Sequence, residues 1–250
     1  MRSLCNVPVV ATLILLSCSG CASYTTPSRG ADFSAMRESQ TDADVAAALA
    51  KKPLAKFPAS IAIVRIESSG YKSPTAQGWG SGKFSVVTTH DVESPVTFEA
   101  LQKLPQVAGL APINRLLLPQ ELQSYRDLRQ AAGALHADML LIYTIDTVFQ
   151  QQDLAEPLTL ITLGLAPDQK IQVISTASAA LLDTRNGYVY GVCEETEHRS
   201  GLTIGWSSDA AVDDARQKTE SKAFDKMAGQ FQTMWAGVVK QYQEPAKTGS

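Results

Sequence analysis

Hydrophobic and polar residues follow one another along this chain in patterns that predict a β-sheet with helices packed on it. Residues 60–67 and 83–89 are apolar and rich in β-branched side chains, which favours buried strands. They flank a glycine-rich loop at 68–82 and are expected to pair as a hairpin with a long loop. Residues 139–149 are apolar on both faces at first and then alternate, which is typical of a strand at the centre of a sheet.

A second hairpin is the clearest pair of elements. Residues 171–183 and 188–195 both have strand character. The four residues between them, 184–187, include Asn186 and Gly187, and these two residue types readily adopt positive φ. We therefore expect an antiparallel pair joined by a tight turn.

Shorter helical patterns occur at three places before this hairpin. Residues 42–51 follow a Thr-x-x-Asp sequence at 41–44 that resembles a capping box. A short helix is expected around 97–103. Residues 120–135 carry apolar side chains at spacings of three and four, which predicts an amphipathic helix.

The longest predicted helix begins near Ser207 or Ser208 and continues to about Tyr242. One stripe of side chains is expected to face inward along it: Val212, Ala215, Thr219, Ala223, Met227, Phe231, Met234, Val238 and Tyr242. A helix of this length needs a whole face of a sheet to cover. The sequence thus predicts an α+β fold, with a single mixed β-sheet, packed helices and a long C-terminal helix, in one globular domain at 57–243 followed by a disordered tail at 244–250.

The N-terminal residues have the order of a bacterial lipoprotein signal peptide. Arg2 precedes a nearly continuous apolar run at 7–16, and the small-residue segment 17–20 leads to Cys21. The apolar run is too short to span a bilayer as a helix. We expect a signal peptide at 1–20 and a tether with one short helix at 21–56.

Two cysteines are candidates for the lipid. We favour Cys21, because Gly20 precedes it, and keep Cys18 as the alternative. The lipoprotein families that this sequence resembles use an Asp after the lipidated cysteine for retention in the inner membrane. Ala22 and Ser19 follow the two candidates here, so the resemblance implies the periplasmic face of the outer membrane. A secreted protein without lipid, cut near Ala22, and a retained short membrane anchor are the alternatives.

Charge and cysteine content exclude several classes. A net charge of −3 argues against nucleic acid as a partner, since a nucleic-acid backbone attracts basic surfaces. Cys193 is the last cysteine after Cys21, so the domain has no internal disulfide, and its strand context predicts a buried apolar side chain. Three scattered histidines without metal-ligand spacing predict no metal and no cofactor.

Gly78-Trp79-Gly80-Ser81-Gly82-Lys83 superficially resembles a phosphate-binding loop. The spacing does not fit, because Gln77 stands where a P-loop has its first Gly and Phe84 stands where it has Ser or Thr. We instead expect Tyr71 and Trp79, in a loop too rich in glycine to bury them, to contact a protein partner.

Three other groups of residues have a structural interpretation that competes with a functional one. His90 and Asp91 have no nucleophile elbow to act with, so catalysis is not expected. The acidic residues at 194–197 could bind calcium weakly, although a solvated strand end is favoured. Met234 and Trp235 could line a pocket, although core packing is favoured.

Four segments in succession resemble the periplasmic lipoproteins related to the curli-secretion channel subunit and to the amino-terminal domain of the Tol-system propeller protein. They are an "IAV"-type strand at 60–66, a helix end and strand at 135–144, a hairpin at 179–189 and a helix at 214–228. The resemblance implies a non-enzymatic envelope lipoprotein that binds other proteins.

Two functions follow as hypotheses. The first is a non-enzymatic, lipid-anchored protein-interaction or assembly factor with an envelope protein as partner, its oligomeric state being left open. The second is a periplasmic binding module for a small ligand or peptide, in a cleft between the sheet and the helix at 120–135.

The signal layout makes a direct prediction about acylation. Replacing Cys21 by Ser should leave the protein unlipidated and soluble in the periplasm, whereas Cys18→Ser should leave acylation intact. Metabolic labelling with a palmitate analogue measures both. Acylation that survives in Cys21→Ser and disappears in Cys18→Ser would show that Cys18 carries the lipid.

Overall fold

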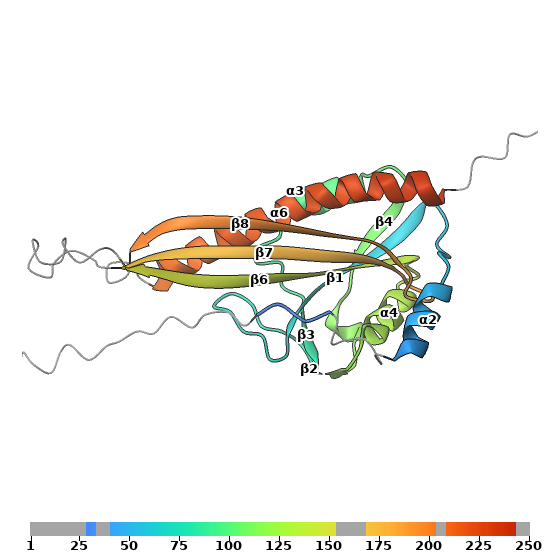
Figure 1. Ribbon diagram of the computed structural model, residues 1–250, viewed down its shortest axis with the longest axis horizontal. Coiled ribbons are helices and arrows are strands. Elements are labelled where there is room, and N and C mark those ends of the chain that lie inside the picture. Colours follow the sequence, from blue (N-terminus) through green and yellow to red (C-terminus); the bar gives the residue numbers. More distant parts are fainter. Residues whose placement is uncertain (1–28, 34–40, 154–168, 204–208, 244–250) are drawn as a thin grey trace, which may run out of the picture.

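A computed structural model of the chain describes residues 29–33, 41–153, 169–203 and 209–243. Its centre is a six-stranded mixed sheet in which the strands follow the order β3-β1-β6-β7-β8, while β4 pairs with the same edge of β1 as β3 (Figure 1). β1 is parallel to β4 and β6, and the other pairs are antiparallel. The strands are β1 (Ala59–Ser68), β3 (Phe84–Val87), β4 (Val107–Pro112), β6 (Met139–Asp153), β7 (Gln169–Asp183) and β8 (Val189–Thr203).

The alternation of side chains across these strands builds two cores, one on each face of the sheet. On the first face lie Ile61, Ile63, Leu141, Tyr143 and the other members of the larger cluster. The neighbouring residues of the same strands point to the second face and form the smaller cluster, which includes Ala62, Val64, Leu140, Ile142, Ala180 and Leu182. The predicted fold class is confirmed, because helices pack on both faces of one mixed sheet.

The long helix α6 (Asp209–Tyr242) covers the first face and lies along β7 and β8 (Figure 1). Most of its predicted inward stripe is buried, although Met234 and Tyr242 are only half-buried. Five further residues are buried that the stripe does not contain: Arg216, Glu220, Phe224, Ala228 and Trp235. Trp235 belongs to the core and Met234 packs against it, so the core packing favoured over a ligand pocket for these two residues is confirmed. The short helix α3 (Pro95–Gln102) lies beside α6, where Thr97 Oγ1 donates to Asp225 Oδ1 at 2.6 Å.

The second face is covered in part by α4 (Tyr125–Ala134), which is shorter than the helix predicted at 120–135. Ser124 is the N-cap, since its side chain accepts from Arg126 N, and Asp127 completes a capping box. The residues before the cap form β5 (Glu121–Leu122), which pairs with β2 (Ser81–Gly82). The 3₁₀ helix η1 (Arg115–Leu117) precedes β5.

The β7–β8 hairpin is longer than the sequence predicts, with 15 residues in each strand. Gly187 has a positive φ of 69° in its turn, as expected, whereas Asn186 does not. Asp183, at the end of β7, accepts from Leu54 N at 2.8 Å and from the Tyr190 hydroxyl at 2.9 Å. These bonds fasten the chain that follows α2 (Asp42–Ala50) to the hairpin, and α2 itself begins at the predicted Thr41 capping box.

Part of the predicted tether docks on the sheet. β1 and β6 pair over residues 61–64 and 139–142. On the C-terminal side of this pairing, residues 29–33 contact β1 at Glu67 and β6 at Thr144. Ser68 N donates to Arg29 O at 3.1 Å, and Ala31 N donates to Thr144 Oγ1 at 2.9 Å. The predicted domain start at residue 57 stays a prediction, but the sequence pattern of a short polar segment does not reveal that residues 29–33 dock on the sheet.

The predicted signal peptide at 1–20, both candidate lipidation sites Cys18 and Cys21, and the predicted tail at 244–250 lie outside the described residues. Within the described ranges, no helix combines the length and the hydropathy that a membrane crossing requires.

Candidate functional site

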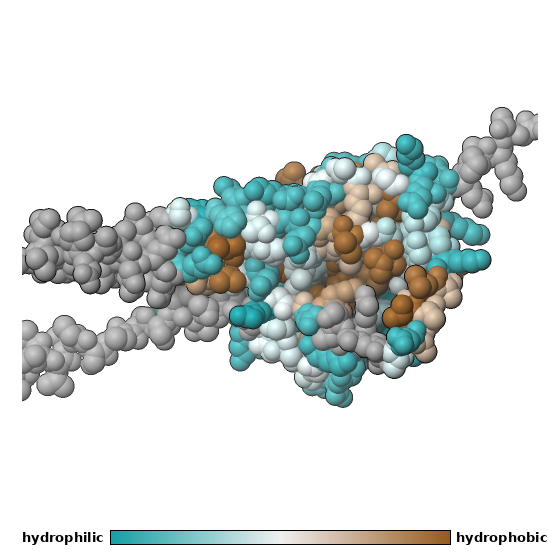
Figure 2. Space-filling view, viewed as in Figure 1, coloured by the Kyte–Doolittle hydropathy of each residue, from teal (hydrophilic) through white to brown (hydrophobic). Residues whose placement is uncertain are grey.

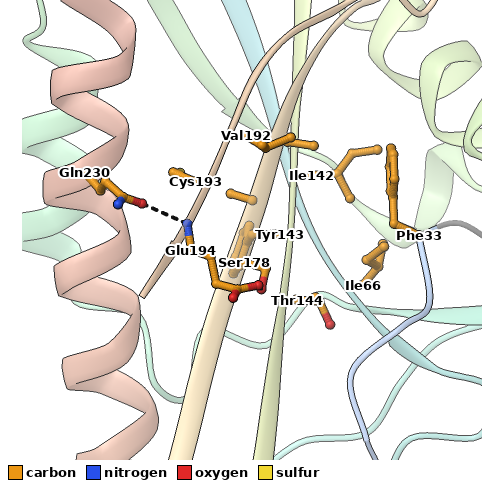
Figure 3. Close-up of a pocket in the computed structure, with 12 residues that line it drawn as sticks. Phe33, Ile66, Ile142, Tyr143, Thr144, Ser178, Val192, Cys193, Glu194 and Gln230 are labelled. Atoms are coloured by element: carbon orange, nitrogen blue, oxygen red, sulfur yellow. Dashed lines mark hydrogen bonds between the residues drawn. The ribbon is translucent and has the colours of Figure 1, made fainter. Parts of the chain in front are cut away.

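The second face of the sheet stays open beyond α4, and a hollow of about 430 Å³ lies there between Phe33 and the edge strand β8 (Figure 3). Strand register brings its floor together, since Ile142 is opposite Ala180, which is opposite Val192, and Thr144 is opposite Ser178. Its lining is mostly apolar with a few polar groups, namely Phe33, Ile66, Ile142, Tyr143, Thr144, Ser178, Ala179, Ala180, Val192, Cys193, Glu194 and Gln230. This composition is typical of a binding surface for an apolar group.

Phe33 forms one wall of the hollow because residues 29–33 are held against the sheet. Its ring stacks on Tyr125 of α4 with the ring centroids 6.2 Å apart. The backbone of Gly30 comes so close to β6 that a Cβ there would lie 2.7 Å from Thr144 Oγ1. Gly30 is therefore the residue that lets this segment approach.

β8 forms the opposite wall and is the outer strand of the sheet in the described part of the chain. Gln230 of α6 reaches around this edge, and its Oε1 accepts from the backbone N–H of Glu194 at 2.8 Å (Figure 3). Ser178 Oγ donates to Glu194 Oε2 at 2.7 Å, which orients the carboxylate across the sheet. Beside them Val192 is 69% exposed, a large value for an apolar side chain in a strand.

Exposed large apolar side chains occur on several elements, and Val192 among them lines this hollow. Among the described residues, the exposed large apolar side chains include Val189 and Val192 on β8, Val45 and Leu49 on α2, and Leu54 after α2. Figure 2 shows hydrophobic residues grouped over the part of β7 and β8 nearest to α2 and α4. A grouping of this kind on one face is a feature of interaction surfaces.

The expected contact residues Tyr71 and Trp79 do not belong to this surface. Tyr71 is 1% exposed and packs with Ala76 and Val87, so the prediction that it is exposed is wrong. The loop folds back on itself, because Tyr71 N donates to Ser68 O and Gly78 N donates to Tyr71 O. This fold places the ring beside Val87 of β3. Trp79 is half-buried against the second core, and Arg115 lies over its ring at 5.6 Å. The glycines of this loop allow close packing against β5, as at Gly82 (φ 107°), instead of freeing the aromatic rings.

A buried charge cluster joins the N-terminal part of α6 to β1 and to the segment that follows β3. It comprises Arg65 and Glu67 of β1, Asp91 and Glu93 after β3, and Arg216 and Glu220 of α6.

Arg65 is its centre, with Nε 2.7 Å from Glu67 Oε1 and Nη1 3.1 Å from Asp91 Oδ1 and 3.5 Å from Glu93 Oε1. Its Nη2 donates to the Tyr71 hydroxyl at 3.2 Å, which explains why this ring is buried. Tyr143 in turn donates to Glu93 Oε1 at 2.9 Å. Sequence reasoning missed this cluster, because a charged residue inside an apolar strand gives no sign of its distant partners.

The α6 half of the cluster has its own bonds to the sheet. Arg216 Nη1 is 2.6 Å from Glu220 Oε2, and Arg216 Nη2 donates to Thr75 Oγ1 at 2.9 Å. Glu220 Oε1 accepts from Thr147 Oγ1 of β6 at 2.8 Å. Helix, sheet and the loop after β1 are thus held by one polar network.

Charge excess and burial act together on the carboxyl groups. Two guanidinium groups face five carboxyl groups, because Asp213 Oδ1 also lies 2.8 Å from Arg216 Nε. Burial disfavours the charged form of a carboxyl group. Burial raises the pKa of Glu67 to about 8, although Arg65 acts in the opposite direction. Burial also raises the pKa of Glu220. The side chains of Arg65, Glu67 and Glu93 are at most 1% exposed, so these three groups are closed to solvent and link β1 to the segment after β3.

The remaining candidate residues have structural surroundings. Cys193 is buried, as expected, and burial raises the pKa of its thiol to about 11. Glu197 of the acidic segment pairs with Lys226 at 2.6 Å and Lys222 at 3.7 Å, so these lysines occupy it. His90 packs against Phe98. Among the described residues, no group of three or more His, Cys, Asp or Glu side chains is arranged to hold a metal ion.

Comparisons with known proteins give little further guidance. No family model and no curated protein matches the chain. Protein XCC0632 of Xanthomonas campestris, of family DUF330, has a TM-score of 0.38 at 12% identity over 76% of this chain and 92% of its own. The PelC dodecamer of Paraburkholderia phytofirmans has a TM-score of 0.31 at 13% identity and covers 71% of this chain and 91% of its own. Lipoprotein GNA1162 of Neisseria meningitidis has a TM-score of 0.27 at 13% identity and covers 74% of this chain and 97% of its own.

At these scores the likenesses support no conclusion about function. None of the three is named as a curli-secretion or Tol-system protein, so that resemblance remains a prediction.

The raised pKa of Glu67 predicts how stability depends on pH. The folded protein binds more protons than the unfolded chain between the unfolded value near 4.5 and the folded value near 8. The free energy of unfolding should therefore fall as pH rises from about 5 to 8, by up to about 1.4 kcal/mol per pH unit for one proton. Glu220 contributes with the same sign. Urea unfolding at a series of pH values measures this slope.

Glu67→Gln imitates the protonated carboxyl group and should fold with a clearly shallower slope. Glu99→Gln, on the exposed surface of α3, is the matched control and should keep the wild-type slope. A Glu67→Gln protein with an unchanged slope would show that Glu67 is ionised throughout this range.

Proposed function

We propose that the protein is a non-enzymatic, lipid-anchored interaction or assembly factor of the cell envelope, and that it binds a partner protein through the open-face hollow. The observation that carries the proposal is the asymmetry of the sheet. One face is closed along its length by α6, whereas the other leaves an apolar hollow beside an edge strand with a 69% exposed Val192. Apolar surface of this kind gains stability when a partner covers it.

The charges around the hollow suggest what the partner presents. Glu194 lines the hollow, and Asp146 lies on the same face of β6 two residues beyond Thr144. Both are acidic, and no Lys or Arg is among the described residues that line the hollow. An apolar segment flanked by Lys or Arg would match both the floor and its rim.

The anchoring part of the proposal rests on the N-terminal signal layout. A lipid on Cys21, with Cys18 as the alternative, would hold the domain at the periplasmic face of the outer membrane. The absence of an Asp after either cysteine supports the outer over the inner membrane.

A small-ligand or peptide-binding module is the second candidate, and the size of the hollow favours it. About 430 Å³ lies within the range of small-molecule sites, roughly 300–1,000 Å³. Among the described lining residues none belongs to α4, and the hollow meets that helix only where Phe33 stacks on Tyr125. The hollow therefore does not coincide with the cleft expected between the sheet and residues 120–135.

Site-specific photocrosslinking in intact cells separates the two candidates. A crosslinking amino acid at position 192 should give a discrete adduct whose mass increases by that of a protein. The same amino acid at position 218, on the exposed surface of α6, is the control and should not give that adduct. Val192→Lys should reduce capture of the crosslinked partner while leaving the unfolding midpoint nearly unchanged, because the side chain is exposed.

Equal crosslinking from positions 192 and 218 would contradict a specific interaction surface. An adduct of small mass from position 192 alone would favour the ligand-binding module.

A further inference from the structure

A second hollow, of about 450 Å³, lies where α4 and the chain after α2 meet the β7–β8 turn. Four of its lining residues are cationic: Lys51, Arg126, Arg129 and Arg185. No carboxylate is among the described residues that line it, although the whole chain has a net charge of −3. Such a concentration of positive charge in an acidic protein creates a local potential that attracts anions.

Two of these cations have no counter-charge among the described residues. The side chains of Lys51 and Arg126 form no hydrogen bond or ion pair with any residue in the described part of the chain. Arg185 differs from them, because it forms an ion pair in which its Nη2 is 2.9 Å from Asp138 Oδ1. The hollow therefore keeps a positive excess after its internal pairing is counted.

Arg129 is fixed in place at the centre of the group. Its Nε donates to Thr184 O at 2.9 Å, its Nη2 donates to Arg185 O, and its guanidinium lies over the Tyr125 ring at 5.9 Å. A guanidinium that is already positioned loses little conformational entropy when it binds an anion.

Thr184 gives an independent sign of a ligand. It lines the same hollow and is 8% exposed, yet its Oγ1 has no hydrogen-bond partner among the described residues. Buried polar groups are nearly always hydrogen-bonded, because leaving one without a partner costs free energy. A rotation of this side chain toward the hollow would let the hydroxyl donate to a ligand with acceptor oxygens there.

We propose that this hollow binds a phosphate group carried on a small polar body. Phosphate offers several acceptor oxygens around one centre, which matches donors converging from α2, α4 and the turn, and guanidinium groups pair with it closely. The volume exceeds that of a bare phosphate and leaves room for the rest of such a molecule. The phosphate could come from a soluble phosphate ester or from an anionic lipid headgroup. The proposal does not depend on the open-face hollow.

The test uses the purified full chain in a non-ionic detergent. Isothermal titration calorimetry measures binding of glycerol 3-phosphate in one arm, and of detergent micelles that contain phosphatidylglycerol, against micelles that contain diacylglycerol, in the other. Lys51→Gln with Arg126→Gln should weaken binding at least about tenfold, since two charge-assisted contacts are lost. Lys103→Gln with Arg199→Gln removes one Lys and one Arg outside the hollow and should leave binding unchanged.

Thr184→Val provides a second variant whose two effects have opposite directions. It removes a buried hydroxyl without a partner, so the unfolding midpoint should rise or stay constant, while phosphate binding should weaken several-fold.

Binding of glycerol 3-phosphate that the Lys51 and Arg126 changes weaken supports a soluble ester as the ligand. Binding of phosphatidylglycerol micelles alone, weakened by the same changes, supports a lipid headgroup. The proposal is overturned if neither probe binds, or if the paired variant and its control bind equally well.

Discussion

The contact of Arg65 with three carboxyl groups is the interaction on which the arrangement of this molecule depends. Arg65 lies in β1, its partners Asp91 and Glu93 follow β3, and Asp91 is also 3.9 Å from Arg216 of α6. Removing one member of a buried ion pair costs about 3–5 kcal/mol, because the other charge is left without compensation. The cluster therefore fixes which part of α6 meets which strands, while the surrounding apolar core supplies the general driving force.

This fixed position of α6 determines which surfaces remain for binding. The helix covers the face built by Ile61, Leu141 and Ala179, and its Gln230 also caps part of the β8 edge. α4 covers only the region near Ile142 and Leu182 on the other face. The long hairpin extends past α4 (Figure 1). The open-face hollow lies on this second face, between Phe33 and β8. The open-face hollow is thus a consequence of unequal helix lengths on the two faces of one sheet.

Periodicity predicted most of the elements because local patterns report burial directly. The strands near 60–67 and 139–149, the hairpin and the long helix all follow from it. Periodicity did not predict β4, a short strand of weak pattern. It also did not predict that Tyr71 is buried, because its hydroxyl is held by a hydrogen bond from Arg65 that only the folded chain forms. The hollow was also beyond sequence reasoning, since its walls come from Phe33 and β8, which only the folded chain brings together.

Native-state hydrogen exchange of the full chain tests most directly whether α6 is a permanent cover for one face. If the buried charge cluster and the apolar core hold the helix on the sheet, amides near Phe224 and Phe231 should exchange only through global unfolding. Their opening free energies should then equal those of Leu141 in β6 and Ala179 in β7. Opening of α6 at a free energy several kcal/mol below that of these strands would contradict the account, because both faces of the sheet would then be accessible.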